Sequence, residues 1–336
     1  MMPANLQPTN DKQCHLSESE WKGFRALSLD NGLLRAVVLP ELGGKIVSLW
    51  QHRTQREWLW HNPDLSLAAG HYDGDYVRCF DTGGMDECFP SVASCHYPHW
   101  PWAGTRIPDH GELWALPWHV QVFEDASVIE LRMRVHGVRF PYRFERVIWL
   151  EAGHAALRFS YRVENLSPFP FSFLWSSHPV LALEPGMRVL LQPQPMRVYG
   201  SPGERLGRFG DALTWPTIKD DQGREWHLDV APAQNSALAV KLWGRAPVYG
   251  VIGLRHEASD SELQFHIDPT EITHLGLWLN YGGWSGVDAN RPYYNLAIEP
   301  CLGAQDSLAI ASDNLADCVV VGGFEHLGWQ MELKLI

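Results

Sequence analysis

Hydrophobic and polar residues alternate with a period of two over long stretches of this chain. Between Ile129 and Val135, four apolar residues alternate with charged ones, and the stretch from Leu157 to Val163 repeats the pattern. Successive side chains of a strand point to opposite faces, so this pattern is typical of antiparallel strands with one buried face. The two stretches therefore predict two half-buried strands.

Apolar runs of similar length, separated by Gly- and Pro-containing turns, continue along the sequence. Further strands are predicted over Leu34–Leu39, Lys45–Trp50, Phe140–Leu150, Phe171–Trp175, Met187–Leu191, Ala237–Trp243, Val248–Arg255, Leu263–Ile267, Leu275–Leu279, Tyr294–Ile298, Cys318–Gly322 and Trp329–Leu335. A hairpin turn is expected at Glu257–Ser261, and a short helix near Glu204–Leu213.

Many strands with little helix predict a sandwich or a barrel. We predict an all-β fold, a large antiparallel two-sheet β-sandwich. We expect it to form a single domain over residues 15–336, preceded by a flexible N-terminal tail at residues 1–14.

Composition changes this picture in two respects. The 336 residues include 16 Trp, most of which we expect in the core, but a rigid indole face also suits the C–H face of a sugar ring. The formal charge of −12 argues against nucleic acid or an anionic membrane surface as a partner, because both attract basic faces. No apolar run approaches the roughly 20 residues that span a bilayer, and the polar start of the chain does not resemble a signal peptide.

The six cysteines include no C-x-x-C pair, which favours reduced thiols in a cytoplasmic protein. Cys88, Cys95, His96 and His99 lie close together but match no standard zinc spacing. We therefore expect neither a metal nor a cofactor.

Candidate chemistry lies where polar residues interrupt the β pattern. The loop from Pro108 to Trp118 combines Asp109, His110 and Glu112 with two tryptophans, a composition typical of a pocket lining. His178 follows Trp175-Ser176-Ser177 at the expected end of one apolar strand, and Glu299 ends another.

Each of these residues also has a structural alternative. Either His could simply bond a backbone carbonyl, and Glu299 could be a buried acceptor. Turn roles are favoured for Asp109 and Asp306, and Glu112 fits a sugar-hydroxyl acceptor and a loop staple equally.

Familiar catalytic templates are absent from the sequence. His110-Gly111-Glu112 has the H-x-E form of zinc deaminases, but the P-C-x-x-C partner fails at Ala304. There is no H-E-x-x-H, G-x-S-x-G or Walker A sequence. Two His and one Glu suit proton transfer on a sugar, in which a base takes the anomeric proton and an acid protonates the ring oxygen.

Several short motifs, taken in order, resemble the aldose 1-epimerase (galactose mutarotase-like) superfamily, and more closely its divergent branch. They are Leu39-Pro40-Glu41-Leu42-Gly43-Gly44-Lys45-Ile46, Gly84-Met85-Asp86-Glu87-Cys88-Phe89-Pro90, Asp109-His110-Gly111-Glu112-Leu113-Trp114, Ser177-His178-Pro179, Gly276-Leu277-Trp278-Leu279-Asn280 and Ala297-Ile298-Glu299-Pro300 with Gly303 and Asp306. The resemblance implies a β-sandwich, with Glu299 as general base and His178 as general acid. It also implies that His110 holds the sugar.

Two positions depart from the family pattern. An arginine expected before the first His is replaced by Asp86 and Glu87, with Arg78 nearby. A substrate-binding Asp, expected between His178 and Glu299, has four candidates, none in a matching motif: Asp211, Asp220, Asp221 and Asp268.

The sequence therefore predicts a cofactor-independent isomerase that interconverts the anomers of a free sugar. The catalytic pair is Glu299 and His178, and the substrate-binding candidates are His110, Glu112, Asp109, Arg78, Glu87 and Trp175. Two alternatives remain: a non-catalytic sugar-binding or sensor protein, and a glycoside hydrolase or lyase that uses Glu112 and Glu299. A phosphorylated sugar is disfavoured because no Arg/Lys cluster accompanies the motifs. Monomer and dimer are both left open.

Overall fold

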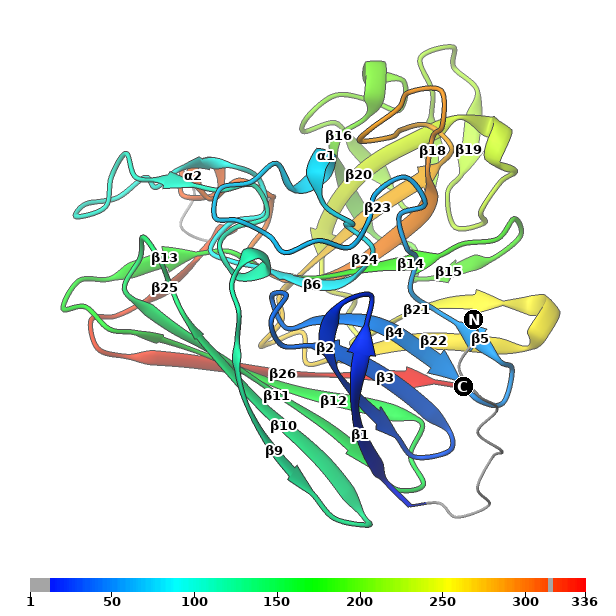
Figure 1. Ribbon diagram of the computed structural model, residues 1–336. Coiled ribbons are helices and arrows are strands. Elements are labelled where there is room, and N and C mark those ends of the chain that lie inside the picture. Colours follow the sequence, from blue (N-terminus) through cyan, green and yellow to red (C-terminus); the bar gives the residue numbers. More distant parts are fainter. Residues whose placement is uncertain (1–12, 314–316) are drawn as a thin grey trace.

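The computed structural model describes residues 13–313 and 317–336, and these form two large antiparallel sheets packed face to face (Figure 1). In the described residues the larger sheet has 14 strands. In spatial order they are β1 (His15–Trp21), β2 (Phe24–Asp30), β3 (Leu34–Leu39), β4 (Lys45–Gln51), β6 (Gly84–Cys88), β14 (Trp175–Ala182), β24 (Tyr294–Leu302), β23 (His274–Tyr281), β20 (Leu238–Arg245), β16 (Pro195–Gly200), β17 (Ala212–Thr214), β18 (Thr217–Lys219) and β19 (Glu225–His227), with β5 (Arg56–Glu57) beside β4.

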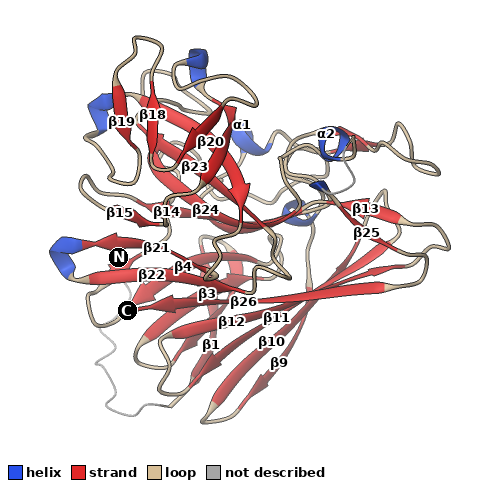
Figure 2. Cartoon of the chain, turned by 180° about the vertical axis from the view of Figure 1, so that it is seen from behind, coloured by secondary structure: helices blue, strands red, loops and turns tan. Residues whose placement is uncertain are grey.

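The smaller sheet has eight strands in the same described ranges. Its order is β15 (Arg188–Leu190), β21 (Val251–His256), β22 (Ser261–Ile267), β26 (His326–Leu335), β12 (Ala156–Asn165), β11 (Tyr142–Glu151), β10 (Val128–His136) and β9 (His119–Glu124). Figure 2 shows the long strands β9–β12 and β26 fanning out in the lower part of the molecule.

Short elements complete the described chain. Two small ribbons pair β13 (Phe171–Phe173) with β25 (Val319–Val321), and β7 (Cys95–His96) with β8 (Arg106–Ile107). The helices are α1 (Tyr76–Cys79), α2 (Leu308–Ala311) and 3₁₀ turns at Leu113–Ala115, Pro202–Glu204, Gln234–Ser236 and Glu257–Ser259. None of the helices in the described ranges is long and apolar enough to cross a membrane.

The prediction of an all-β antiparallel sandwich is confirmed, and alternation explains the core. On β11, residues at every second position are buried, and they face the inner side of the larger sheet. One continuous hydrophobic cluster between the sheets includes residues as far apart as Leu29, Phe144 and Leu333.

The other face of the larger sheet is covered as well, which explains why its central strands are buried almost throughout. On β24, Leu296 and Ile298 face the core, so the alternating residues Asn295, Ala297 and Glu299 face the opposite side. The loops of residues 60–83, 89–115 and 283–293 lie over that outer side, and the candidate site is formed beneath them.

Three local predictions are wrong. The expected helix near Glu204–Leu213 is a series of turns after a 3₁₀ turn, because Gly207 and Gly210 have φ of +107° and +87°. His178 and Glu299 lie within β14 and β24, which continue past both residues instead of ending there. The expected strand Phe171–Trp175 divides between β13 and β14, which belong to different sheets.

One residue of the predicted N-terminal tail is part of the folded structure. Residues 1–12 lie outside the described residues, but Cys14 is buried and its Sγ donates to the carbonyl oxygen of Leu150 at 3.3 Å. The structured part of the chain therefore includes at least the last of the residues assigned to the tail.

Candidate functional site

The candidate site lies on the outer face of the larger sheet, where four adjacent strands carry polar residues. Strand register places Lys241 of β20 opposite Trp278 of β23, and Trp278 opposite Ala297 of β24. Glu299, two residues from Ala297, lies opposite Gly276, and His178 comes from the neighbouring strand β14. Because cross-strand partners share a face, these side chains all point to the same side of the sheet.

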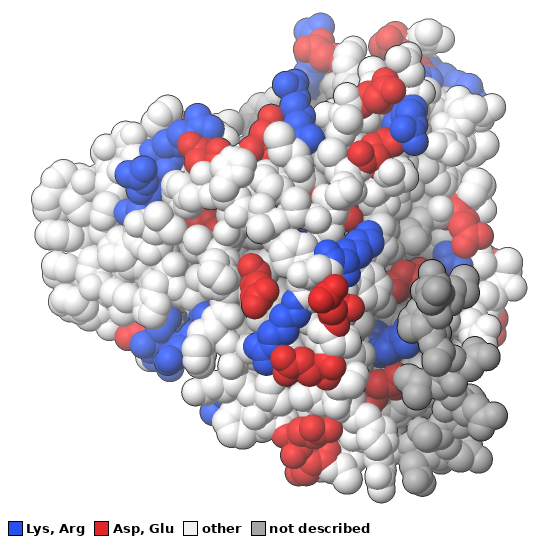
Figure 3. Space-filling model, viewed as in Figure 1, with Lys and Arg blue, Asp and Glu red and all other residues white. Residues whose placement is uncertain are grey.

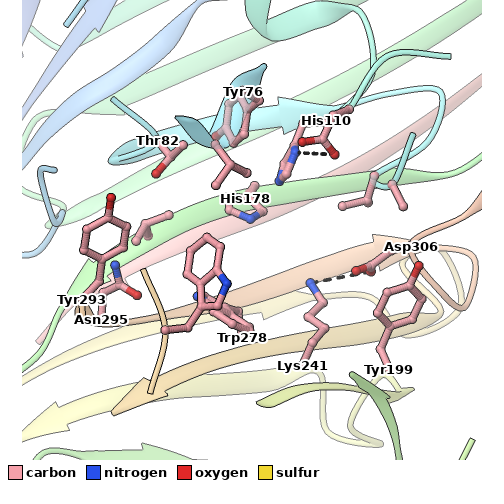
Figure 4. Close-up of a pocket in the computed structure, with 16 residues that line it drawn as sticks. Tyr76, Thr82, His110, His178, Tyr199, Lys241, Trp278, Tyr293, Asn295 and Asp306 are labelled. Carbon is pink, nitrogen blue, oxygen red and sulfur yellow. Dashed lines mark ion pairs between the residues drawn. The ribbon is translucent and has the colours of Figure 1, made fainter. Parts of the chain in front are cut away.

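A cavity of about 230 Å³ opens above these strands (Figure 4). It is smaller than the roughly 300–1,000 Å³ of pockets for drug-sized ligands, and it matches a single sugar ring better than a chain of sugars. Its lining residues are Tyr76, Val77, Thr82, Val92, Ala93, Asp109, His110, His178, Val180, Tyr199, Lys241, Trp278, Trp284, Tyr293, Asn295 and Asp306.

His178 and Glu299 meet at the floor of the cavity. The distance from His178 Nε2 to Glu299 Oε1 is 3.8 Å. Burial lowers the pKa of His178 to about 4, although the Glu299 carboxylate opposes the shift. Burial alone would raise the pKa of Glu299, but Lys241 and His178 outweigh it and hold that pKa below its ordinary value. At neutral pH the pair is therefore a neutral imidazole beside an ionised carboxylate.

Glu299 lies behind the cavity wall and does not itself line the cavity. Its side chain is about 1% exposed. Lys241 Nζ donates to Oε2, and Ser176 Oγ lies 3.4 Å from the same oxygen. Oε1 is buried without a hydrogen-bond partner among the described residues. His178 and Lys241 line the cavity, and Glu299 lies behind them.

His110 enters the cavity from the loop that covers the sheet. Its φ of +58° is unusual for a residue other than glycine, and its backbone N–H donates to the Val92 carbonyl oxygen at 2.6 Å. Gly111 follows with a φ of +76°, and a Cβ there would lie only 2.0 Å from the Phe89 carbonyl oxygen. The loop therefore requires glycine beside His110 and holds the imidazole in one place.

Three groups surround the His110 ring. Tyr76 stacks on it with ring centroids 4.0 Å apart, and His178 approaches at right angles with centroids 5.2 Å apart. Asp109 Oδ1 lies 3.2 Å from His110 Nδ1, close enough for an ion pair. The geometry of the two groups does not meet the requirements of a hydrogen bond. Burial would raise the pKa of Asp109, but His110 more than offsets this and lowers it.

The sequence analysis assigned no ligand-binding role to the other polar residues of the cavity. Lys241 lies within the predicted strand Ala237–Trp243 and was not considered as a site residue. A lysine in a strand that is buried on both faces nevertheless indicates a charge with a nearby partner. Asp306, to which a turn role was assigned, lies 3.6 Å from Lys241 Nζ, and burial raises its pKa despite that lysine. Asn295 adds an amide, and Trp278 an indole face (Figure 4).

Four predicted substrate-binding residues lie away from the cavity lining, and three of them have structural roles. The Glu112 carboxylate is buried and accepts hydrogen bonds from the Tyr72 and Tyr142 hydroxyls and from the Val138 and Arg139 amides at 2.8–3.1 Å. These contacts favour a structural role in holding the loop over a role as a sugar-hydroxyl acceptor.

Glu87 faces the core in place of the cavity. It pairs with Arg146 at 2.9 Å and accepts from the indole of Trp175 at 2.8 Å. Both Glu87 and Trp175 are therefore buried in the core and absent from the cavity lining, which does not support the expectation that they bind substrate. Arg78 is exposed on α1 and does not line the cavity.

The candidates for a substrate-binding aspartate also lie elsewhere. Asp211, Asp220, Asp221 and Asp268 are absent from the cavity lining of the described residues. Within those residues, no group of three or more His, Cys, Asp or Glu side chains is arranged to hold a metal ion, and all six cysteines are unpaired.

On the face drawn in Figure 3, basic and acidic side chains of the described residues are interspersed, and none of the basic ones gather into a broad patch.

Comparisons with known proteins agree with this architecture. A profile of the aldose 1-epimerase family matches residues 25–192, which is half of the chain. One similar solved structure is a galactose mutarotase-related enzyme from Lactobacillus acidophilus, with 12% sequence identity, coverage of 93% of this chain and 97% of that one, and a TM-score of 0.63. A galactose mutarotase-like protein from Lactobacillus casei has 16% identity, coverage of 93% of this chain and 100% of that one, and a TM-score of 0.62. A galactose mutarotase-like protein from Clostridium acetobutylicum has 12% identity, coverage of 97% of this chain and 99% of that one, and a TM-score of 0.65. At such identities these structures support the fold alone, but with the family match they agree with the resemblance in the motifs. The chain belongs to the aldose 1-epimerase family.

Proposed function

We propose that this protein is a cofactor-independent isomerase that interconverts the α and β anomers of a free, monosaccharide-sized sugar. One observation carries the proposal. His110, His178 and Glu299, which are distant in the sequence, converge at one cavity, with the two imidazoles 5.2 Å apart and the carboxylate 3.8 Å from His178. Anomer exchange needs a base and an acid on either side of C1, and this arrangement offers both.

In the proposed reaction His178 and Glu299 act as one proton-accepting unit. The neutral imidazole takes the proton of the anomeric hydroxyl, and the ionised Glu299 stabilises the imidazolium that forms. His110, which lies beside Asp109 and stacks on Tyr76, acts as the acid and gives a proton to the ring oxygen. The C1–O5 bond breaks to give the open-chain aldehyde.

Rotation about C1–C2 then exposes the other face of the aldehyde. The O5 hydroxyl attacks C1 and returns its proton to His110, while His178 returns its proton to O1. Both imidazoles end in their starting states. This division of roles differs from the one implied by the resemblance, because Glu299 does not line the cavity and His178 and Lys241 lie between it and the cavity.

The charges of the cavity favour an uncharged sugar. Lys241 is the one lysine or arginine among the described lining residues, and its ammonium already pairs with Glu299. Asp109 and Asp306 add further carboxyl groups, so a phosphate or carboxylate on the substrate would meet no lysine or arginine that is free of a carboxylate partner. We also propose a cytoplasmic location, which the six unpaired thiols support.

One alternative retains support. A non-catalytic sugar-binding protein would need the cavity and Trp278 but not proton transfer, and the covered position of Glu299 fits that role. A hydrolase or lyase using Glu112 and Glu299 loses its support, because the Glu112 oxygens are occupied by four donors outside the cavity lining.

A polarimetric assay on freshly dissolved α-anomers of a panel of aldoses tests the proposal, together with calorimetric binding of the same sugars. We expect at least one sugar whose approach to equilibrium is accelerated by the protein and slowed by about 10²- to 10⁴-fold in His178→Asn. Binding of a sugar with equal mutarotation rates in wild type, His178→Asn and buffer would favour the non-catalytic alternative.

A further inference from the structure

Lys241 is the residue of this site that neither the motifs nor the family resemblance indicates. It comes from β20, lies opposite Trp278, and is buried except for about a tenth of its side chain, which reaches the cavity (Figure 4). Its Nζ donates to Glu299 Oε2 and lies 3.6 Å from Asp306 Oδ1. One ammonium group thus joins the two carboxyl groups of β24 and of the turn that follows it.

The strand beside Lys241 leaves room for this contact. Gly276 of β23 lies opposite Glu299, and a Cβ at that position would lie 3.1 Å from Glu299 Oε2 and 3.4 Å from Lys241 Nζ. An alanine there would therefore press on the ion pair. Because residue 276 has no side chain, the Lys241 ammonium group and the Glu299 carboxylate have room to pair above β23.

The pairing matters because Glu299 is buried. An isolated carboxylate at such a place tends to take up a proton, since burial penalises its charge. Burial alone would lower the pKa of Lys241, but Asp306 and Glu299 outweigh it and raise that pKa above the ordinary value of lysine. The ammonium group is thus charged throughout the physiological range and favours the carboxylate form of Glu299.

Lys241 also lines the cavity. The resemblance led us to expect a cationic residue from the loop before His110, where the chain has Asp86 and Glu87. Asp86 pairs with Lys45 at 2.6 Å, and Glu87 pairs with Arg146 on the core side. The positive charge that borders the cavity comes from β20 instead.

We infer that Lys241 is a positioning residue for the reaction: it fixes Glu299 behind His178 as a carboxylate and offers an N–H to a sugar hydroxyl. This inference rests on the proposed function for its effect on turnover. Its effect on Glu299 does not depend on turnover and can be measured separately.

The test compares Lys241→Met, which removes the charge, with Lys241→Arg, which keeps it. Lys219, an exposed residue of β18, does not line the cavity, and Lys219→Met makes the same substitution there as the control. The first readout is the pH titration of the Glu299 side-chain carboxyl by ¹³C NMR, assigned with Glu299→Gln, in the absence of any sugar.

We expect the Glu299 midpoint to rise by at least one pH unit in Lys241→Met and to change by less than half a unit in Lys241→Arg and Lys219→Met. An unchanged midpoint in Lys241→Met would overturn the inference. If Lys241→Met does not fold, Lys241→Gln takes its place, because its amide keeps a donor for Oε2 and removes the charge.

The second readout is the pH profile of kcat/KM for the best sugar. The acid limb should move upward by at least one unit in Lys241→Met, so that kcat/KM below the limb falls about tenfold for each unit. A uniform loss at all pH values would indicate a merely structural role and contradict the inference. If no sugar is turned over by wild type, the proposed function fails, and the NMR titration still decides the role of Lys241.

Discussion

Adding a single methyl group at Gly276 tests the geometry of the site without removing any charged group. Gly276 has no left-handed φ, so alanine fits the backbone of β23. Its Cβ would lie 3.1 Å from Glu299 Oε2 and 3.3 Å from Glu299 Cβ. These contacts are shorter than the roughly 3.5–4.0 Å optimum between such atoms, so the carboxylate must move by a few tenths of an ångström.

The expected effect on stability is small because two contributions oppose each other. Replacing a strand glycine by alanine stabilises by about 0.5–1 kcal/mol, and overpacking costs about 1–3 kcal/mol. We expect the free energy of unfolding to fall by no more than about 2.5 kcal/mol. A 1 Å misplacement in a catalytic site costs about 10²-fold, so a few tenths of an ångström should lower kcat about 3- to 10-fold.

The assay is steady-state polarimetry with urea unfolding of the same preparations. Gly200→Ala on β16 is the matched control, because a Cβ there would have no atom within 4 Å. We expect Gly200→Ala to keep the wild-type kcat. If Gly276→Ala also keeps it, the contact between Gly276 and the Lys241–Glu299 pair does not position the reacting groups, and the reasoning is refuted.

Three further predictions follow from buried groups. Glu112→Gln should lower the free energy of unfolding by about 2–3 kcal/mol, because one of the groups that donate to the carboxylate would then face the N–H of the glutamine amide. It should leave KM unchanged, and a raised KM with unchanged stability would support a sugar-binding role for Glu112. Burial lowers the pKa of both His178 and His274 to about 4, so from about pH 6.5 down to 4.5 the unfolded chain binds protons that the folded chain does not. As the pH falls through this range, the free energy of unfolding measured in urea should decrease by up to about 1.4 kcal/mol per pH unit for each histidine. His274→Gln should remove the contribution of His274, and an unchanged dependence of the unfolding free energy on pH in this variant would contradict the prediction. Trp278→Ala should raise KM about tenfold with little change in kcat, by loss of about 1.4 kcal/mol of ring contact, and an unchanged KM would remove Trp278 from the sugar site.

The sequence was most informative where one face of a strand is buried and the other is exposed. Strands β10 and β12 alternate in that way, and their predicted ranges agree with the structure to within two residues at each end. Strand β1 is exposed on both sides at the edge of its sheet, so it has no alternation, and it was missed. A pattern that depends on burial cannot reveal a strand that buries little.

The candidate site was predicted in part for a similar reason. His110, His178 and Glu299 interrupt apolar or aromatic surroundings, and all three lie at the cavity or directly beneath it. Glu87 and Glu112 interrupt their surroundings equally, but their partners, Arg146 and Tyr142, lie 59 and 30 residues away. Local sequence does not distinguish a carboxylate that binds a ligand from one that is satisfied by distant donors.

The central claim is that the cavity holds a sugar at C1 and O5 and exchanges its anomers through His178 and Glu299. Two-dimensional exchange NMR of an equilibrated sugar measures this most directly, because it reports the rate of α–β interconversion without net reaction. The account predicts exchange cross-peaks with wild type that fall to the buffer level with Glu299→Gln, while Lys219→Met retains them. Cross-peaks of equal strength with wild type and Glu299→Gln for every sugar, or none with wild type, would contradict it.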